Sequence, residues 1–196
     1  MPTKAEVRLA IRERLKKLGE KDRATLSRVI CRQLKKMLGD EPHAIGVYLP
    51  FVDEPDIRPL IVELIGHGWT VCIPSVPTLG KKPMAFKQIK ELSDVKRDPV
   101  TGIPQPVTGV PLENEEILQT IIVPGRAFSS NCDRLGRGGG GYDNWIRLQR
   151  LRNPSTRYIG ICFECQILQE IPMESHDEKV DMVLTCKNLF RKAVSD

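Results

Sequence analysis

The stretch TIIVPGRAFSSNCDRLGRGGGGYDNWIRLQRL, residues 120–151, joins an apolar run to a dense cluster of glycines and then to a helical pattern. Residues 120–124 are typical of a buried strand, and residues 142–151 repeat apolar side chains at helical spacing. Between them, five glycines occupy the six positions from Gly136 to Gly141. Because glycine is costly to order, the cluster indicates either a disordered linker or a loop whose backbone approaches a ligand closely.

Strands and helices alternate outward from this stretch. Further strands are expected at residues 44–50, 70–74, 84–89, 157–163 and 180–185, and helices at residues 56–68 and 164–171. The strands are continuous apolar runs, which is typical of parallel strands covered on both faces. The pattern predicts one α/β domain over residues 1–196, with a mostly parallel sheet and helices on both faces. Residues 94–113, rich in Pro and Gly, are expected to form an ordered loop across one face.

Residues 1–39 predict a pair of helices packed on this domain. Thr3 and Glu6 have the spacing of a capping box. An apolar stripe follows at helical spacing and is expected to end at Gly19; it comprises Val7, Ile11, Leu15 and Leu18. A second helix is expected from about Asp22 to Gly39.

The composition excludes several classes of protein. Of 196 residues, 40% are hydrophobic, and no apolar run is long enough to cross a membrane. The net charge of +5 is mild, so we expect no nucleic-acid partner, although a basic RNA-binding module over residues 4–36 is an alternative. The first residues lack a secretory signal, and Glu6 and Glu13 are unusual in a transit peptide. We expect a cytoplasmic monomer without membrane attachment, with a mitochondrial location left open.

Six cysteines and three histidines are scattered along the chain. Buried thiols in a reducing compartment explain most of the cysteines. Cys162 and Cys165 form a CxxC pair, for which a redox role is the alternative interpretation. A zinc site would need further ligands that this spacing does not supply.

The glycine cluster also has the properties of a phosphate-binding loop. Glycines let backbone amides converge on an anion, and the helix expected from Tyr142 would point its positive end at the loop. Arg134 and Arg137 supply guanidinium groups suited to phosphate oxygens. Asp143 can hold Mg²⁺ beside phosphates, or it can simply cap the helix. The GxGxxG pattern itself stands too far behind its strand to indicate a dinucleotide site.

Residues 123–146, VPGRAFSSNCDRLGRGGGGYDNWI, resemble the signature of the 5-formyltetrahydrofolate cyclo-ligase family, also called 5,10-methenyltetrahydrofolate synthetases. The resemblance extends to YLPFVDE at residues 48–54, GIPQP at residues 102–106 and ESHDEKVDMVLT at residues 174–185. It implies an ATP-dependent ring closure that converts 5-formyltetrahydrofolate to 5,10-methenyltetrahydrofolate and releases ADP and phosphate. ATP would be the co-substrate and Mg²⁺ the cofactor.

The resemblance also implies site residues. Arg134 and Arg137 would be catalytic, and Asp143 would hold Mg²⁺ together with Asp177, which is otherwise a turn residue. The ATP-binding residues would be Lys4, Arg8, Arg134, Gly136, Arg137, Gly138, Gly139, Gly140, Gly141 and Tyr142. For Lys4 and Arg8 the alternative is an ordinary solvated helix face.

Folate contacts would come from Leu49, Glu54, Met84, Arg137 and Tyr142. Glu54 would accept hydrogen bonds from the donor edge of the pterin, whereas Met84 suits a flat ring and equally suits the core.

Two positions depart from the family pattern where the folate is expected to pack. Gly141 stands where the family has a second aromatic residue before the aspartate, and Thr101 stands where it tends to carry an aromatic residue. The alternative is therefore a nucleotide-binding relative with altered or lost folate turnover.

Overall fold

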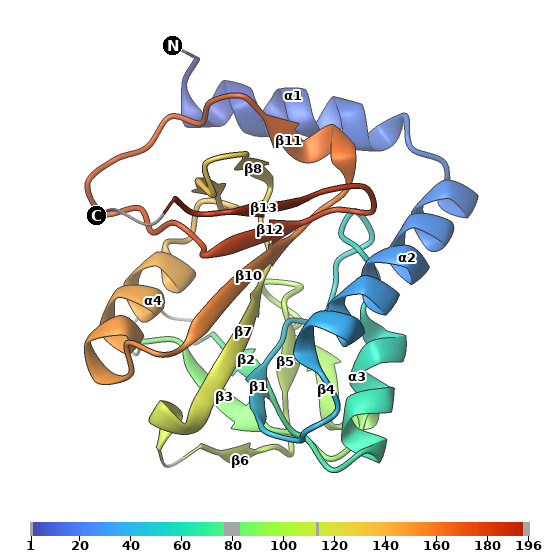
Figure 1. Ribbon diagram of the computed structural model, residues 1–196, viewed down its shortest axis with the longest axis vertical. Coiled ribbons are helices and arrows are strands. Elements are labelled where there is room, and N and C mark those ends of the chain that lie inside the picture. Colours follow the sequence, from blue (N-terminus) through green and yellow to red (C-terminus); the bar gives the residue numbers. More distant parts are fainter. Residues whose placement is uncertain (1, 77–82, 113, 194–196) are drawn as a thin grey trace.

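A central sheet organises the fold in the computed structural model, which describes residues 2–76, 83–112 and 114–193 (Figure 1). Within these ranges eight strands pair in the order β13-β12-β10-β7-β1-β2-β3-β6. The bounds are β1 Ala44–Gly46, β2 Thr70–Ser75, β3 Ala85–Gln88, β6 Val110–Pro111, β7 Leu118–Val123, β10 Arg157–Ile161, β12 Met182–Leu184 and β13 Leu189–Arg191. The central strands from β12 to β2 are parallel, and the edge strands β13, β3 and β6 are antiparallel. The predicted α/β fold with a mostly parallel sheet is confirmed.

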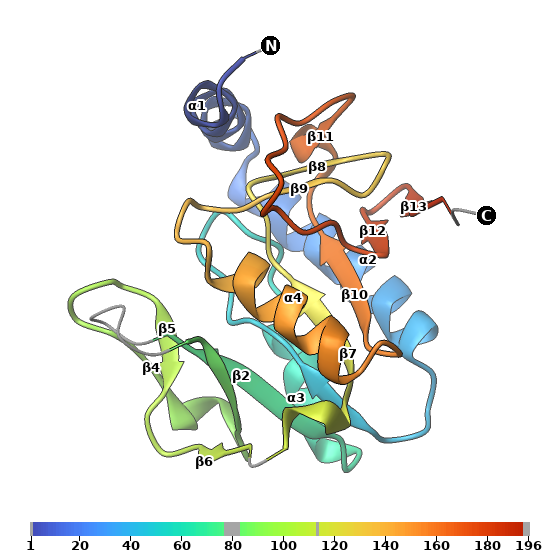
Figure 2. The ribbon, with the colours of Figure 1, turned by 90° about the vertical axis from the view of Figure 1, so that its left-hand side faces the viewer.

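The helices cover both faces of this sheet. Helices α2 (Glu20–Leu38) and α3 (Arg58–Gly66) lie on one face, and α4 (Gly141–Arg152) lies on the other (Figures 1 and 2). Helix α1 (Lys4–Lys16) crosses one end of the molecule and packs against η3 (Glu164–Gln166) and β8 (Ala127–Ser129). Two further 3-10 turns are η1 (Leu92–Asp94) and η2 (Glu115–Ile117). No helix within the described ranges combines the length and apolar character needed to cross a bilayer.

Burial on both faces explains the continuous apolar strands. Ile45, Val71 and Ile122 belong to the core under α1, α2 and α3. Ile121 and Tyr158 belong to a second core under α4. Successive residues of a strand point to opposite faces, so a strand with two buried faces has no polar side.

The N-terminal helices begin and end close to their predicted positions. Thr3 and Glu6 form the capping box, with Thr3 N donating to Glu6 Oε2 at 2.7 Å. Helix α1 ends at Lys16, before Gly19, and Gly19 is the N-cap of α2. The single glycine therefore starts the second helix rather than ending the first.

Several predicted elements differ from the structure at the chain's turning points. Strand β1 ends at Gly46 rather than at Pro50, and Tyr48 and Leu49, which were predicted to continue it, line a cavity. Residues 164–171 form only the turn η3 and strand β11 (Ile167–Leu168), because the Gln166 amide turns inward to the carbonyls of Gly125 and Arg126. Strand β12 is not the last strand, since β13 returns antiparallel to it.

The Pro- and Gly-rich segment 94–113 is more regular than a loop. It contains a hairpin of β4 (Val95–Arg97) and β5 (Pro104–Pro106), which extends from the sheet beside β2 (Figure 2). Asp98 accepts hydrogen bonds from the amides of Val100 and Thr101 at the tip. Prolines are tolerated there because these strands lie at an edge.

A small second sheet carries the glycine loop. It has the order β11-β8-β9, where β9 is Arg134–Leu135. Phe128 of β8 is fully buried against β10, where it packs on Gly160.

We expect Gly160→Ala to destabilise the protein by about 1–3 kcal/mol, because a Cβ at residue 160 would lie 2.9 Å from Phe128 Cζ and closer still to Cε1. The measurement is the thermal unfolding midpoint, which should fall by about 2–4 °C per kcal/mol. Gly66→Ala is the matched control, since within the described residues a Cβ there meets no atom within 4 Å. Equal midpoints for the two variants would show that the Phe128 ring can move aside.

Candidate functional site

A cavity of about 460 Å³ opens at the carboxyl ends of the central strands. It lies where the sheet order reverses between β7 and β1, the usual ligand position in such sheets. The segments after Leu49, Pro74 and Pro124 line it, in agreement with the rule that such sheets bind ligands beyond the carboxyl ends of their strands. The segment after Phe163 does not; Phe163 is buried in the core, and Gln166 supports the loop behind the cavity.

The glycine loop forms one wall of this cavity and is ordered by its contacts. Gly138 and Gly140 have φ angles of 109° and 66°, which favour glycine. Gly139, Gly140 and Gly141 line the cavity, and Gly140 is the N-cap of α4. The linker interpretation is therefore wrong for these residues, and the start of α4 points at the cavity as predicted.

Helix α1 delivers basic side chains to the loop. Arg8 Nε donates to Gly136 O at 2.9 Å, and a Cβ at Gly138 would lie 3.7 Å from Arg8 Cζ. Lys4 Nζ lies 2.6 Å from Asp177 Oδ2 and 3.3 Å from Glu174 Oε1. Neither residue belongs to a purely solvated face, and neither is among the residues that line the cavity.

Arg134 is buried within the cavity wall, with 4% of its surface exposed. Its Nη2 donates to Asp143 Oδ1 at 2.6 Å and its Nη1 to Pro124 O at 3.2 Å. Among the described residues, Arg134 Nε and Tyr142 Oη have no hydrogen-bond partner although both are buried. Burial raises the pKa of Tyr142, so its hydroxyl keeps its proton. Both residues line the cavity, where a bound polar group or a water molecule would satisfy these atoms.

Arg137 lies between two carboxylates. Its Nε and Nη2 donate to Glu54 Oε1 at 3.0 Å and 2.7 Å, and Nη2 also donates to Asp53 Oδ1 at 2.7 Å. The guanidinium lies over the Phe51 ring, 4.2 Å from its centroid. Burial acts to lower the pKa of Arg137, but the charges of Glu54 and Asp53 outweigh this and raise it. Arg137 therefore remains a cation.

The predicted folate residues all line the same cavity: Leu49, Glu54, Met84, Arg137 and Tyr142. Met84 is 6% exposed and belongs to the core under α4, so it serves the core as well. Gly141 and Thr101, the two departures from the family pattern, both line the cavity.

Sequence reasoning missed several residues of this wall. The hairpin supplies Ile103 and Pro104, and Phe51 comes from the loop after β1. For Arg137, the two adjacent acids Asp53 and Glu54 were the one sequence feature that could have indicated its carboxylate partners. For the hairpin the sequence offered only the GIPQP resemblance and the departure at Thr101, because the position of the hairpin depends on packing against β2.

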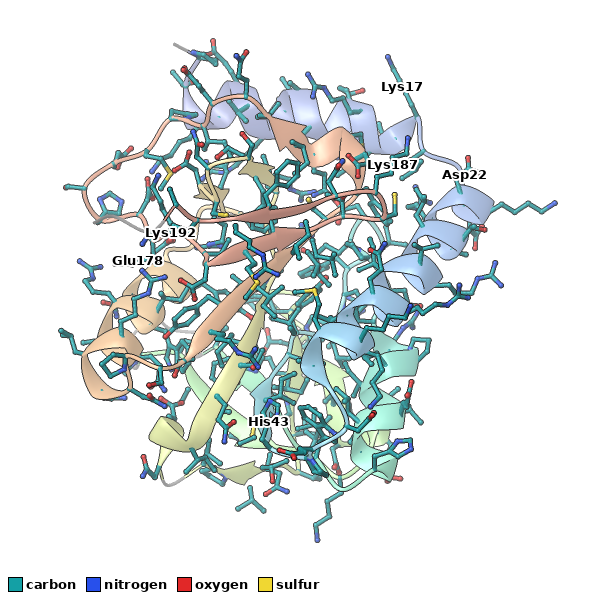
Figure 3. The ribbon with its side chains drawn as sticks, in the orientation of Figure 1. Lys17, Asp22, His43, Glu178, Lys187 and Lys192 are labelled. Carbon is teal, nitrogen blue, oxygen red and sulfur yellow. The ribbon has the colours of Figure 1, made fainter. Side chains whose placement is uncertain are left out.

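The two predicted magnesium ligands lie on neighbouring segments. Asp143 is not a helix cap; its Oδ1 accepts from Arg134 and, at 3.2 Å, from the Glu178 amide next to Asp177. Figure 3 shows Glu178 beside α4. Within the described ranges no cluster of three or more His, Cys, Asp or Glu could hold a metal ion. One or two carboxylates completed by phosphate oxygens nevertheless fit Mg²⁺, which binds proteins in this way.

The cysteines take no part in the cavity wall. All six are free thiols. Burial raises the pKa of Cys162 and Cys165, which disfavours the thiolate that redox chemistry requires.

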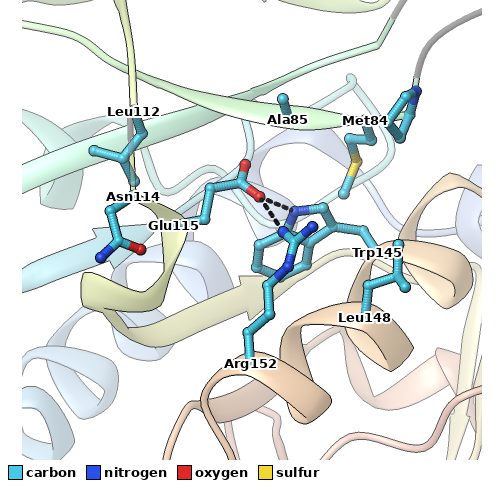
Figure 4. A pocket seen from close by; sticks show the side chains of 9 residues that line it. Met84, Ala85, Leu112, Asn114, Glu115, Trp145, Leu148 and Arg152 are labelled. Carbon is cyan, nitrogen blue, oxygen red and sulfur yellow. Dashed lines mark hydrogen bonds and ion pairs between the residues drawn. The ribbon is translucent and has the colours of Figure 1, made fainter.

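A second cavity of about 450 Å³ lies between β3 and α4 and shares Met84 with the first (Figure 4). Glu115 accepts from Trp145 Nε1 at 2.9 Å and from the Phe86 amide at 2.7 Å, and Arg152 lies 3.5 Å away. These groups satisfy one another and tie α4 to the edge of the sheet.

Comparisons with known proteins agree with this geometry. Residues 1–186 match the model of the 5-formyltetrahydrofolate cyclo-ligase family. A probable 5-formyltetrahydrofolate cyclo-ligase of Schizosaccharomyces pombe is 33% identical over 68% of this chain and 70% of its own length. The 5-formyltetrahydrofolate cyclo-ligase of Escherichia coli is 30% identical over 73% of this chain and 78% of its own length.

A solved structure shares the fold over nearly the whole chain. The 5,10-methenyltetrahydrofolate synthetase of Aquifex aeolicus superposes with a TM-score of 0.82 at 26% identity, covering 98% of this chain and 94% of its own. The match of the family over almost the full length, together with this structural likeness, establishes that the chain is an enzyme and belongs to the 5-formyltetrahydrofolate cyclo-ligase family.

Proposed function

We propose that this enzyme uses ATP to convert 5-formyltetrahydrofolate to 5,10-methenyltetrahydrofolate, with release of ADP and phosphate. The observation that carries the proposal is the cavity wall itself: the glycine-loop backbone, the buried Arg134 and the more exposed Arg137 line one cavity with Glu54, Met84 and Tyr142. A triphosphate requires the first set of groups and a reduced pterin the second. Their shared cavity would hold the two substrates in contact.

Two ion pairs of the site would exchange their partners when the nucleotide binds. Lys4 is paired with Asp177, and Arg134 with Asp143. In each pair the cation is a candidate phosphate ligand and the carboxylate is a candidate Mg²⁺ ligand. Phosphates arriving with Mg²⁺ would bind both partners, so the rearrangement would leave no buried charge unpaired. Bound Mg²⁺ would supply charge neutralisation for the phosphate oxygens.

The expected chemistry is a phosphoryl transfer followed by ring closure. The formyl oxygen attacks the γ-phosphorus of ATP, and ADP leaves. N10 of the folate then attacks the formyl carbon, the carbon–oxygen bond breaks, phosphate leaves and the N10 proton passes to the departing phosphate or to water. The enzyme assists mainly by positioning and by stabilising charge, so Arg134, Arg137 and the loop amides suffice as catalytic groups.

Glu54 would orient the folate. Its Oε2 accepts from the Phe51 amide at 2.9 Å, while its Oε1 holds Arg137. We propose that the pterin donor edge takes over Oε1 when the substrate binds, while Arg137 keeps its contact with Asp53 and faces the phosphates. Met84 and Leu49 would contact the flat ring.

The function is tested with purified protein, Mg-ATP and 5-formyltetrahydrofolate, by following the near-ultraviolet absorbance of the methenyl product and the release of ADP. We expect both signals to require protein and ATP, and to appear in equal amounts. Absorbance without protein-dependent ADP would contradict the proposal. Stabilisation by ATP against heat without any product would favour the nucleotide-binding relative with lost folate turnover.

We expect Gly141→Tyr to tighten folate binding. Residue 141 has no left-handed conformation, and a Cβ there would only touch Met84 Sδ at 3.9 Å, so a ring can be added at the cavity wall. A stacked ring contributes about 1 kcal/mol, roughly a fivefold lower KM for 5-formyltetrahydrofolate. Gly141→Ala is the control, because it also replaces the first glycine of α4 by a better helix former but adds no ring. An equal KM for the two variants would contradict stacking at this position.

A further inference from the structure

Asp53 connects two arginines behind the cavity wall. Its Oδ2 accepts from Arg126 Nη1, and its Oδ1 accepts from Arg137 Nη2 at 2.7 Å. Neither Asp53 nor Arg126 is among the residues that line the cavity, whereas Arg137 is. The side chains of Asp53 and Arg126 are therefore linked to the cavity through the hydrogen bond between Asp53 and Arg137.

Arg126 is fixed in place by its backbone. Its amide donates to Leu135 O at 2.7 Å, and its carbonyl accepts from Gln166 Nε2 at 3.1 Å. Gln166 is 1% exposed, and its Oε1 accepts from the Phe163 amide. Only 14% of the Arg126 side chain is exposed. The backbone of Arg126 is thus held at the junction between β7 and β8, and its guanidinium is held by Asp53.

The charges of this cluster balance. Arg126 and Arg137 supply two positive charges, and Asp53 and Glu54 supply two negative charges. Burial acts to raise the pKa of Asp53, but the hydrogen bonds and charges of Arg126 and Arg137 lower it overall. Asp53 therefore stays ionised at neutral pH. If Glu54 turned to the folate, Asp53 would remain as the counterion of Arg137.

We infer that Asp53 and Arg126 are positioning residues for the reaction: Arg126 holds the Asp53 carboxylate, and Asp53 sets the Arg137 guanidinium toward the transferred phosphoryl group. This inference rests on the proposed function. If the carboxylate that holds a guanidinium is itself free to move, the guanidinium can change its direction. Because Arg126 holds the Asp53 carboxylate, the Arg137 guanidinium keeps its direction. Small displacements of such a group reduce catalysis strongly.

The test compares Asp53→Asn, Arg126→Gln, Arg126→Lys and the double variant D53N/R126Q. We expect Asp53→Asn to lower kcat by about 10-fold or more and to change the KM for 5-formyltetrahydrofolate much less. Arg126→Gln should have the same kind of effect, and Arg126→Lys should restore most of the rate. The double variant should be no slower than Asp53→Asn, because Arg126 acts through Asp53. Asp56→Asn, which removes only the ion pair with Arg58 at the surface, is the matched control.

The outcomes separate this inference from the proposed function. A wild-type rate for Asp53→Asn, or independent effects that multiply in the double variant, would overturn the inference while the function stands. If Asp53→Asn unfolds below the assay temperature, the rates of Arg126→Gln and Arg126→Lys decide instead. Equal rates for these two variants would overturn the inference. If wild-type protein makes no product, the proposed function fails. Calorimetry then decides the inference by comparing ATP dissociation constants. The inference requires that Asp53→Asn and Arg126→Gln bind ATP more weakly than the wild type.

Discussion

Arg137→Ala is expected to lower kcat/KM by about 10²- to 10³-fold, since it removes a forked donor from the developing charge of the transferred phosphoryl group. Nucleotide affinity should fall by about 1 kcal/mol or more, because a charge-assisted hydrogen bond is lost. Arg137→Lys should recover only part of the activity, because an ammonium keeps the charge without the fork. The measurements are steady-state kinetics and ATP binding by calorimetry.

Arg58→Ala provides the control for this substitution. Arg58 also pairs with an aspartate, but at the surface and outside the cavity. It should leave kcat/KM unchanged. An Arg137→Ala enzyme that bound ATP as tightly as the wild type would show that the glycine loop has been assigned to the wrong ligand.

Arg134→Ala is expected to damage both folding and activity. The Arg134 side chain is 3% exposed and that of Asp143 is 14% exposed, so the substitution leaves a nearly buried carboxylate without its cation. Breaking such a pair costs about 3 kcal/mol or more. The thermal midpoint should fall by about 2–4 °C for each kcal/mol, and product formation should be lost.

A second substitution separates the two effects. The double variant R134A/D143N removes the stranded charge and should recover much of the lost stability without recovering activity. Arg150→Ala is the control from the same helix region: it loses ion pairs with Glu178 and Asp181 but lies outside the cavity, so its folded fraction should remain active. A midpoint for Arg134→Ala equal to that of the wild type would mean that Asp143 finds another partner.

Local patterns were sufficient for most of the elements. The capping box of Thr3 and Glu6, the apolar stripe of α1 and the buried runs of β2 and β7 all depend on neighbouring residues, so they were predictable. The ordered glycine loop was also predictable from the sequence, because positive φ angles such as those of Gly138 and Gly140 favour glycine. Prediction failed where a distant contact overruled a local preference, as at Gln166, whose buried amide ends a helical pattern after one turn.

The sequence by itself determined the α/β class, the family resemblance and the set of cations and carboxylates available for phosphate chemistry. Only the tertiary structure decided which of these charges meet: Arg8 reaches Gly136 across 128 residues, and Arg137 reaches Glu54 across 83. It also placed the hairpin of β4 and β5 beside the cavity and put Asp53 between two arginines. The physical reason is that the periodicity of a chain specifies which face of an element is buried, whereas the partner of a charged side chain depends on how separate elements pack.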